Sequence, residues 1–81
     1  MTDAENRIRN FVTTSFARGG AAIGADTSLL DSGLIDSTGI FELVTFLEGE
    51  FGIAVADEDI VPEHFETVRQ IAAFVDGKRP R

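Results

Sequence analysis

The feature that most constrains this chain is a stripe of apolar residues in its middle, spaced as on one face of a helix with 3.6 residues per turn. The stripe consists of Ile40, Leu43, Val44, Leu47 and Phe51. The side-chain oxygens of Asp36 and Ser37, just before it, can accept hydrogen bonds from the free N–H groups of a first turn, and Gly52 follows it. The pattern predicts a helix over residues 37–51 with its two leucines fully buried. Ser37 would lie at the positive end of this helix, a favourable place for a phosphate ester.

A capping box predicts a first helix near the N-terminus. Thr2 occupies the N-cap position, and Glu5 stands three residues later. Ile8 and Val12 then share one face of the helix. We expect this helix to end at Gly19-Gly20, where glycine can adopt the left-handed conformation that stops a helix.

A second capping box, formed by Thr67 and Gln70, predicts a last helix. Four apolar residues make its inner face: Val68, Ile71, Ala72 and Val75. We expect the helix to end at Gly77 and a mobile basic tail to occupy about residues 77–81.

The remaining segments complete a prediction of one all-α domain over residues 1–81. Residues 19–36 form a connection long enough to suggest a functional loop. Residues 57–61 predict a short helix with acids at its start, stopped by Pro62. Residues 53–56 are apolar, but there is no second strand with which they could pair. The expected fold is a four-helix bundle with a long loop between the first two helices and a short third helix.

Composition and charge exclude several classes of function. The chain has no cysteine and one histidine, so it offers neither thiol chemistry nor a zinc or iron site. A pairing of Ser37 with His64 is the minimum for a hydrolase, but no oxyanion hole is evident, and we expect no catalysis. The acidic run 57–59 lacks the alternating pattern of a calcium loop.

The net charge of −7 is unevenly distributed, because no Lys or Arg lies between residues 19 and 68. This acidic middle would repel nucleic acid and would favour a partner with a basic docking surface. No apolar run is long enough to span a membrane, and no signal peptide is apparent. We therefore expect a cytoplasmic monomer that does not insert into membranes.

The run from Gly33 to Phe51 resembles the acyl and peptidyl carrier proteins. The resemblance rests on Asp36-Ser37, on the Leu-Val-x-x-Leu-Glu-x-Glu-Phe-Gly-Ile sequence of residues 43–53 and on the acids at 57–59. It implies an acyl-carrier-protein-like fold with phosphopantetheine covalently attached to Ser37. In such a carrier the arm holds an acyl or aminoacyl group as a thioester and delivers it to partner enzymes. Asp36 would form part of what the modifying phosphopantetheinyl transferase recognises.

The residues after the serine bear on the cargo. Fatty-acid-type carriers usually have Leu and then a polar residue here, whereas this chain has Thr38-Gly39. The Gly-Leu-Ile-Asp-Ser sequence of residues 33–37 more resembles freestanding carriers of amino acids, such as the D-alanyl carrier proteins. We therefore favour an aminoacyl cargo over a fatty-acid or polyketide-type acyl cargo. The expected partners are the transferase, an acyl- or aminoacyl-loading ligase and a downstream transferase.

The resemblance also implies that partners recognise the start of the helix. The residues concerned are Thr38, Phe41, Glu42, Thr45 and Glu48. The alternative is that Phe41 packs under the 19–36 loop and the acids only keep the protein in solution. A further alternative for the whole chain is an unmodified acidic helical interaction module, in which Ser37 only caps a helix.

Overall fold

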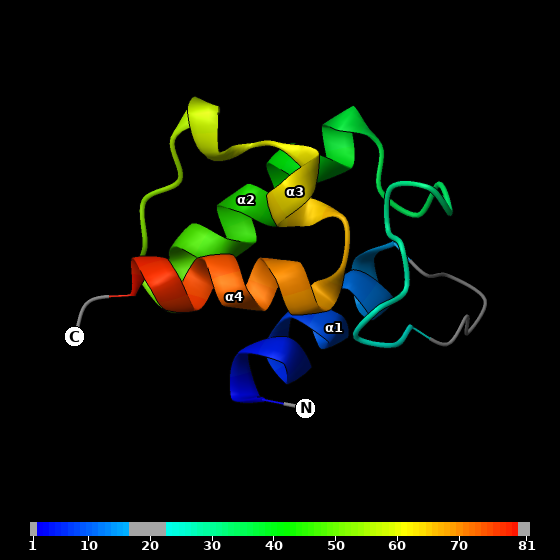
Figure 1. The fold of residues 1–81 in the computed structure, drawn as a ribbon, viewed down its shortest axis with the longest axis horizontal. Helices are drawn as coiled ribbons and strands as arrows, with labels where there is room; N and C mark the ends of the chain where they lie inside the picture. The colour runs from blue at the N-terminus through cyan, green and yellow to red at the C-terminus, as the bar shows by residue number, and fades with distance from the viewer. Residues whose placement is uncertain (1, 17–22, 80–81) are drawn as a thin grey trace.

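The computed structural model describes residues 2–16 and 23–79, and its fold is all-helical (Figure 1). The described elements are α1 (Asp3–Ser15), α2 (Ser37–Phe51), a 3₁₀ turn η1 (Asp57–Asp59), α3 (Pro62–Phe65) and α4 (Val68–Lys78). The predicted arrangement, with a short third helix, is confirmed. Residues 53–56 form no strand, as expected from the sequence.

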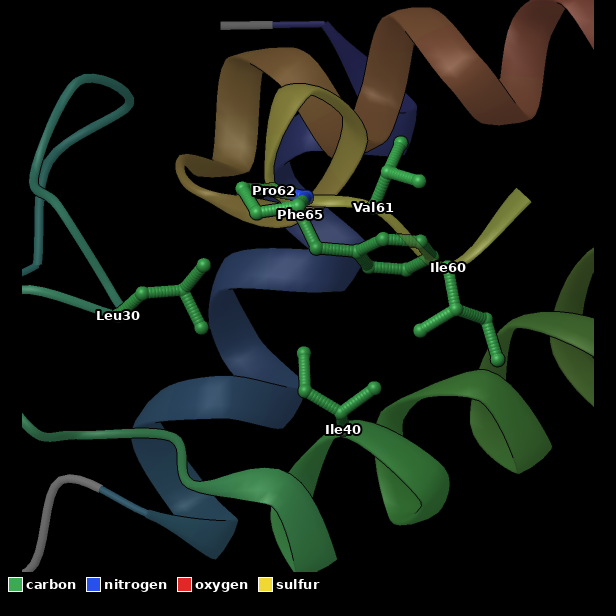
Figure 2. A pocket seen from close by; sticks show the side chains of 6 residues that line it. All are labelled: Leu30, Ile40, Ile60, Val61, Pro62 and Phe65. Carbon is green, nitrogen blue, oxygen red and sulfur yellow. The ribbon is translucent and has the colours of Figure 1, made fainter. Parts of the chain in front are cut away.

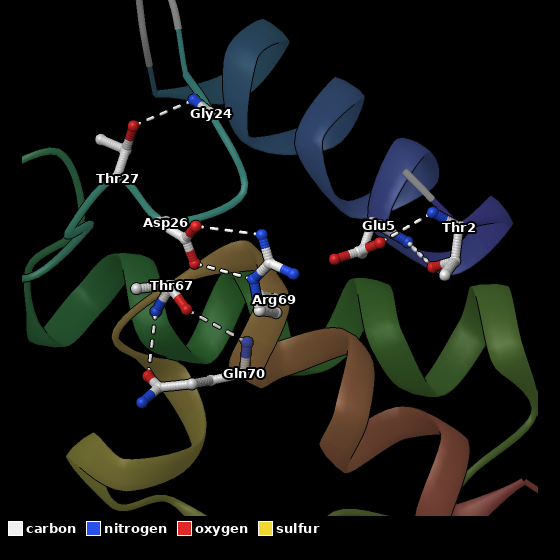
Figure 3. Close-up of polar contacts among 8 residues, drawn as sticks. All are labelled: Thr2, Glu5, Gly24, Asp26, Thr27, Thr67, Arg69 and Gln70. Atoms are coloured by element: carbon white, nitrogen blue, oxygen red, sulfur yellow. Dashed lines mark hydrogen bonds and ion pairs between the residues drawn. The ribbon is translucent and has the colours of Figure 1, made fainter.

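The two predicted capping boxes are present and fix the starts of α1 and α4 (Figure 3). The Thr2 hydroxyl accepts from the Glu5 N–H at 3.1 Å, and the Glu5 carboxylate accepts from the Thr2 N–H at 2.7 Å. This second bond is the main reason why the pKa of Glu5 lies below its usual value. Thr67 and Gln70 repeat the arrangement at 3.1 and 3.2 Å. Each box satisfies two N–H groups that would otherwise lack partners.

The predicted ends of α1 and α4 were wrong. α1 ends at Ser15, whereas Gly19-Gly20 lies outside the described residues. α4 continues through Gly77 to Lys78, whose ammonium group pairs with Asp59 at 2.8 Å. This ion pair favours a helical last turn, and the expected tail therefore begins inside the helix. The pair also contributes most to lowering the pKa of Asp59.

The prediction of a short helix over residues 57–61 that stops at Pro62 was wrong: residues 57–59 form only a 3₁₀ turn, and Pro62 begins α3. The preceding helical turn, η1, has already ended at Asp59. Proline is favoured at the first position of a helix because the N–H group that it lacks would have no partner there. Phe65, the last residue of α3, is fully buried against the core.

One apolar core joins the helices, and α1 packs along α4. Leu43 and Leu47 of α2 are both 0% exposed, which confirms the predicted inner face of this helix. Phe11 of α1 stacks on Phe46 of α2, with ring centroids 4.1 Å apart. None of the helices in the described residues combines the length and the apolar character that crossing a membrane requires.

The described part of the long loop is fastened to the junction of α3 and α4. The Leu29 N–H donates to the Glu66 carbonyl at 2.7 Å, and the Arg69 N–H donates to the Ala25 carbonyl at 3.0 Å. The Arg69 guanidinium also binds both carboxylate oxygens of Asp26, at 2.8 and 3.0 Å (Figure 3). This interaction lowers the pKa of Asp26. The loop therefore reaches the start of α2 from a fixed position.

Candidate functional site

The start of α2 leaves the Ser37 hydroxyl free. The sequence offered both Asp36 and Ser37 as the cap, and the structure assigns this role to Asp36. Its carboxylate accepts a hydrogen bond from the Gly39 N–H at 2.8 Å. Ser37 is the first residue of the helix and is exposed, and its hydroxyl has no hydrogen-bond partner among the described residues. The hydroxyl is therefore available to a reacting partner at the positive end of a helix.

An exposed surface surrounds this serine. Thr38 and Glu42 are exposed, and the Phe41 side chain is 62% exposed. The alternative that Phe41 packs under the loop is therefore wrong. Thr45 is also exposed, and its hydroxyl donates to the Phe41 carbonyl at 3.0 Å. Most of the predicted recognition residues thus lie together on the outer side of α2.

Glu48 differs from the other predicted recognition residues because it has an internal role. Its carboxylate accepts a hydrogen bond from the Val55 N–H at 3.0 Å. The bond ties the extended link after α2 back onto the helix. Glu48 is exposed and can still meet a partner, but its replacement would also release this link.

An apolar cavity of about 150 Å³ lies beside the start of α2 (Figure 2). Its lining residues are Leu30, Ile40, Ile60, Val61, Pro62 and Phe65. Leu30 reaches in from the loop and Ile40 from α2, and the Phe65 ring lies across from them. Sequence reasoning missed this cavity because its walls come from three separate segments, which only the folded structure brings together. Ile40 lies three residues after Ser37, so the cavity is close to the free hydroxyl.

The single histidine, His64, packs between η1 and α4. The Nδ1 atom of His64 lies 2.9 Å from the Asp59 carbonyl oxygen, and its ring stacks on Phe74 with centroids 4.8 Å apart. Within the residues that the structure describes, no three His, Cys, Asp or Glu side chains group as a metal site.

Comparisons with known proteins identify the family. The family model for a phosphopantetheine attachment site matches residues 6–75. The chain is 35% identical over 80 residues to acyl carrier protein 2 of Pseudomonas aeruginosa, with 99% of each chain covered. It is 38% identical over 50 residues to the D-alanyl carrier protein of Abiotrophia defectiva, with 62% of this chain and 63% of that protein covered.

A solved structure supports the same assignment. The apo structure of KstB-PCP matches with a TM-score of 0.77 and 39% identity, covering 95% of this chain and 86% of that chain. The match extends over all four helices of an acyl-carrier-like fold, which confirms the predicted fold class. The chain belongs to the family of phosphopantetheine-binding carrier proteins, which carry a cargo and are not enzymes.

Proposed function

We propose that Ser37 is the residue that receives phosphopantetheine from coenzyme A. The observation that supports this most is the division of roles at the start of α2, where Asp36 caps the helix and Ser37 is exposed and free. A serine that served as the cap would lose its hydrogen bond on modification. Here the Ser37 oxygen can form a phosphate ester while the helix keeps its cap.

The backbone around Ser37 can accommodate the phosphate of phosphopantetheine. The first N–H groups of a helix lack partners within it, and those of Gly39 and Ile40 already bind Asp36. The N–H groups of Ser37 and Thr38 remain for water or for an anion. They lie at the positive end of α2, where a phosphate diester is stabilised.

The attached arm supplies chemistry that the chain lacks. There is no cysteine in the sequence, so the thiol that holds the cargo has to come from the arm. The role of the chain is to present that thiol to a loading ligase and then to a downstream transferase. We propose that the modifying transferase recognises Asp36 together with Ser37, since Asp36 is exposed and adjacent to the Ser37 residue.

We propose an aminoacyl cargo. Its support is Thr38-Gly39 after the serine and the likeness to a D-alanyl carrier protein and to KstB-PCP. An acyl cargo is the second candidate, because the cavity beside α2 is lined entirely by apolar side chains. An apolar cavity of about this volume can hold a molecule of the size of benzene. The likeness to acyl carrier protein 2 also favours this second candidate.

The test of both proposals is intact mass spectrometry in two steps. Incubation with coenzyme A and a phosphopantetheinyl transferase should add one phosphopantetheinyl group. The holo protein is then offered amino acids with ATP and candidate aminoacyl ligases, or fatty acids with ATP and an acyl ligase. We expect aminoacyl loading to be the faster. Preferential loading of fatty acids would reverse the choice of cargo and leave the carrier function standing.

We further propose that Phe41 and Glu42 form the partner surface beside the arm. Phe41→Ala should leave the free energy of unfolding nearly unchanged, because the side chain is exposed, but should slow loading of the holo protein. Glu42→Lys should slow association with a basic partner, most clearly at low salt. Stopped-flow association and loading rates measure both effects.

Two controls make this test specific. Asp76→Lys changes the net charge equally on α4, away from the proposed surface, and should have a much smaller effect on association. Phe46→Ala removes a half-buried ring that stacks on Phe11, so this variant should lose stability where Phe41→Ala does not. Wild-type loading and association rates in both Phe41→Ala and Glu42→Lys would place the docking surface elsewhere.

A further inference from the structure

The first turn of α2 lies against the side chain of Phe16, the residue that follows α1, at Gly39. A Cβ atom built on Gly39 would lie 3.0 Å from Cε1 of Phe16, 3.3 Å from Cγ2 of Ile35 and 3.4 Å from Oδ1 of Asp36. Few real Cβ atoms have neighbours this near, so any larger residue would force the ring or the turn to shift. Glycine is unfavourable within helices, and its presence in the first turn of α2 is explained by this contact.

The Phe16 ring is itself held in place. It contacts Phe11 edge-on, with centroids 5.9 Å apart, and Phe11 stacks on Phe46 at 4.1 Å. Phe11 belongs to α1 and Phe16 directly follows it, whereas Gly39 and Phe46 belong to α2. α1 therefore holds α2 at two points, its first turn and its middle. With the middle fixed, the contact at Gly39 sets the position of the first turn.

We propose that Phe16 and Gly39 are a positioning pair for the attachment serine, an inference that rests on the proposed role of Ser37. Ser37 lies two residues before Gly39 and directly after Asp36, whose carboxylate binds the Gly39 N–H. A displacement of Gly39 would therefore move the cap and the hydroxyl together. Group transfer is sensitive to such shifts, since a misplacement of about 1 Å can lower a rate about a hundredfold.

The experiment compares the kinetics of phosphopantetheine transfer among apo variants, well below their melting temperatures. Gly39→Ala should lower kcat by about tenfold, because the displacement is a fraction of an ångström, while KM for the carrier should stay nearly constant. Phe16→Leu should lower kcat by about threefold, because it withdraws the ring edge. The double variant should return kcat to within about threefold of wild type, since leucine leaves room for the new methyl group.

Gly49→Ala is the matched control. Gly49 lies in the same helix, and a Cβ atom there would meet nothing within 4 Å. The Gly49→Ala variant should have a melting temperature roughly 2–8 °C higher, because alanine favours the helix more than glycine does, and its kcat should be unchanged. Gly39→Ala makes the same chemical change in the same helix, but only Gly39→Ala should slow the reaction.

The possible outcomes separate this inference from the proposed function. A folded Gly39→Ala protein with wild-type kcat would overturn the positioning role, and so would a slow variant that Phe16→Leu fails to rescue. If Gly39→Ala does not fold, the Phe16→Leu variant tests the proposal instead. A wild-type kcat in Phe16→Leu would then overturn the positioning role. Failure of the wild-type protein and of Gly49→Ala to accept the arm would instead overturn the assignment of Ser37.

Discussion

Replacing Ser37 by alanine is expected to abolish the gain of a phosphopantetheinyl group while the fold is kept. The free energy of unfolding should change by less than about 0.5 kcal/mol, as is usual for an exposed side chain without partners. The sequence alone does not predict this small change in the free energy of unfolding, because either Asp36 or Ser37 could have been the helix cap. The structure gives the cap to Asp36, so no capping energy is lost with the serine hydroxyl. Intact mass after incubation with coenzyme A and a transferase measures the first effect, and urea unfolding the second.

Two neighbouring variants control this result. Thr38→Ala removes an adjacent exposed hydroxyl from the same turn and should still gain the arm. Asp36→Ala should cost about 0.5–2 kcal/mol, the usual cost of losing a cap, and Asp36→Asn should restore most of it. A Ser37→Ala protein that still gains the arm would show that another residue is the attachment point. A loss of stability larger than that of Asp36→Ala would show that the serine is structural.

The starts of the helices could be predicted because each depends on residues that are close in sequence. Thr2 with Glu5 and Thr67 with Gln70 are capping boxes that function within a single turn. Gly52 ends α2 in the left-handed conformation, with φ of 66°, which is also a local preference. The face of α2 that carries Leu43 and Leu47 followed from periodicity alone.

Local patterns misplaced the ends of α1 and α4, and at both ends the structure shows a contact with another segment. Phe16 follows the last residue of α1 and packs against Gly39 of α2. Gly77 does not stop α4, because Lys78 has a partner in Asp59. A glycine permits a helix to end but does not require it. Neither contact can be inferred from sequence spacing.

The functional site likewise combines features that the local sequence predicts with features that depend on the whole fold. The position of Ser37 at a helix start followed from the sequence, whereas the sequence left open whether Phe41 is exposed, and the structure decides this. The cavity, the bond from Val55 to Glu48 and the ion pair of Arg69 with Asp26 did not, because each joins segments whose distance in space depends on the whole fold. Recognition of the motif therefore identified the proposed attachment residue, and the structure added what surrounds it.

The largest stability effect is expected from Leu47→Ala. Leu47 is 0% exposed on the inner face of α2, and truncation of such a leucine leaves a cavity that costs about 2–5 kcal/mol. Native domains are stable by only about 5–15 kcal/mol, and a chain of this length buries comparatively little surface. The variant should therefore lose a large fraction of its stability, which urea unfolding at equilibrium measures directly. A loss below about 1 kcal/mol would mean that the inner face of α2 has been assigned incorrectly.

Leu34→Ala is the matched control for this variant. It deletes the same atoms from a leucine that is only half-buried at the end of the loop, so it should cost clearly less than Leu47→Ala. The comparison also separates stability from function. Leu47 faces the core and Ser37 faces solvent, so Leu47→Ala protein that is still folded at low temperature should accept phosphopantetheine at close to the wild-type rate. A modification rate that fell in proportion to stability would indicate that recognition by the transferase depends on the packing of α2 as well as on its exposed first turn.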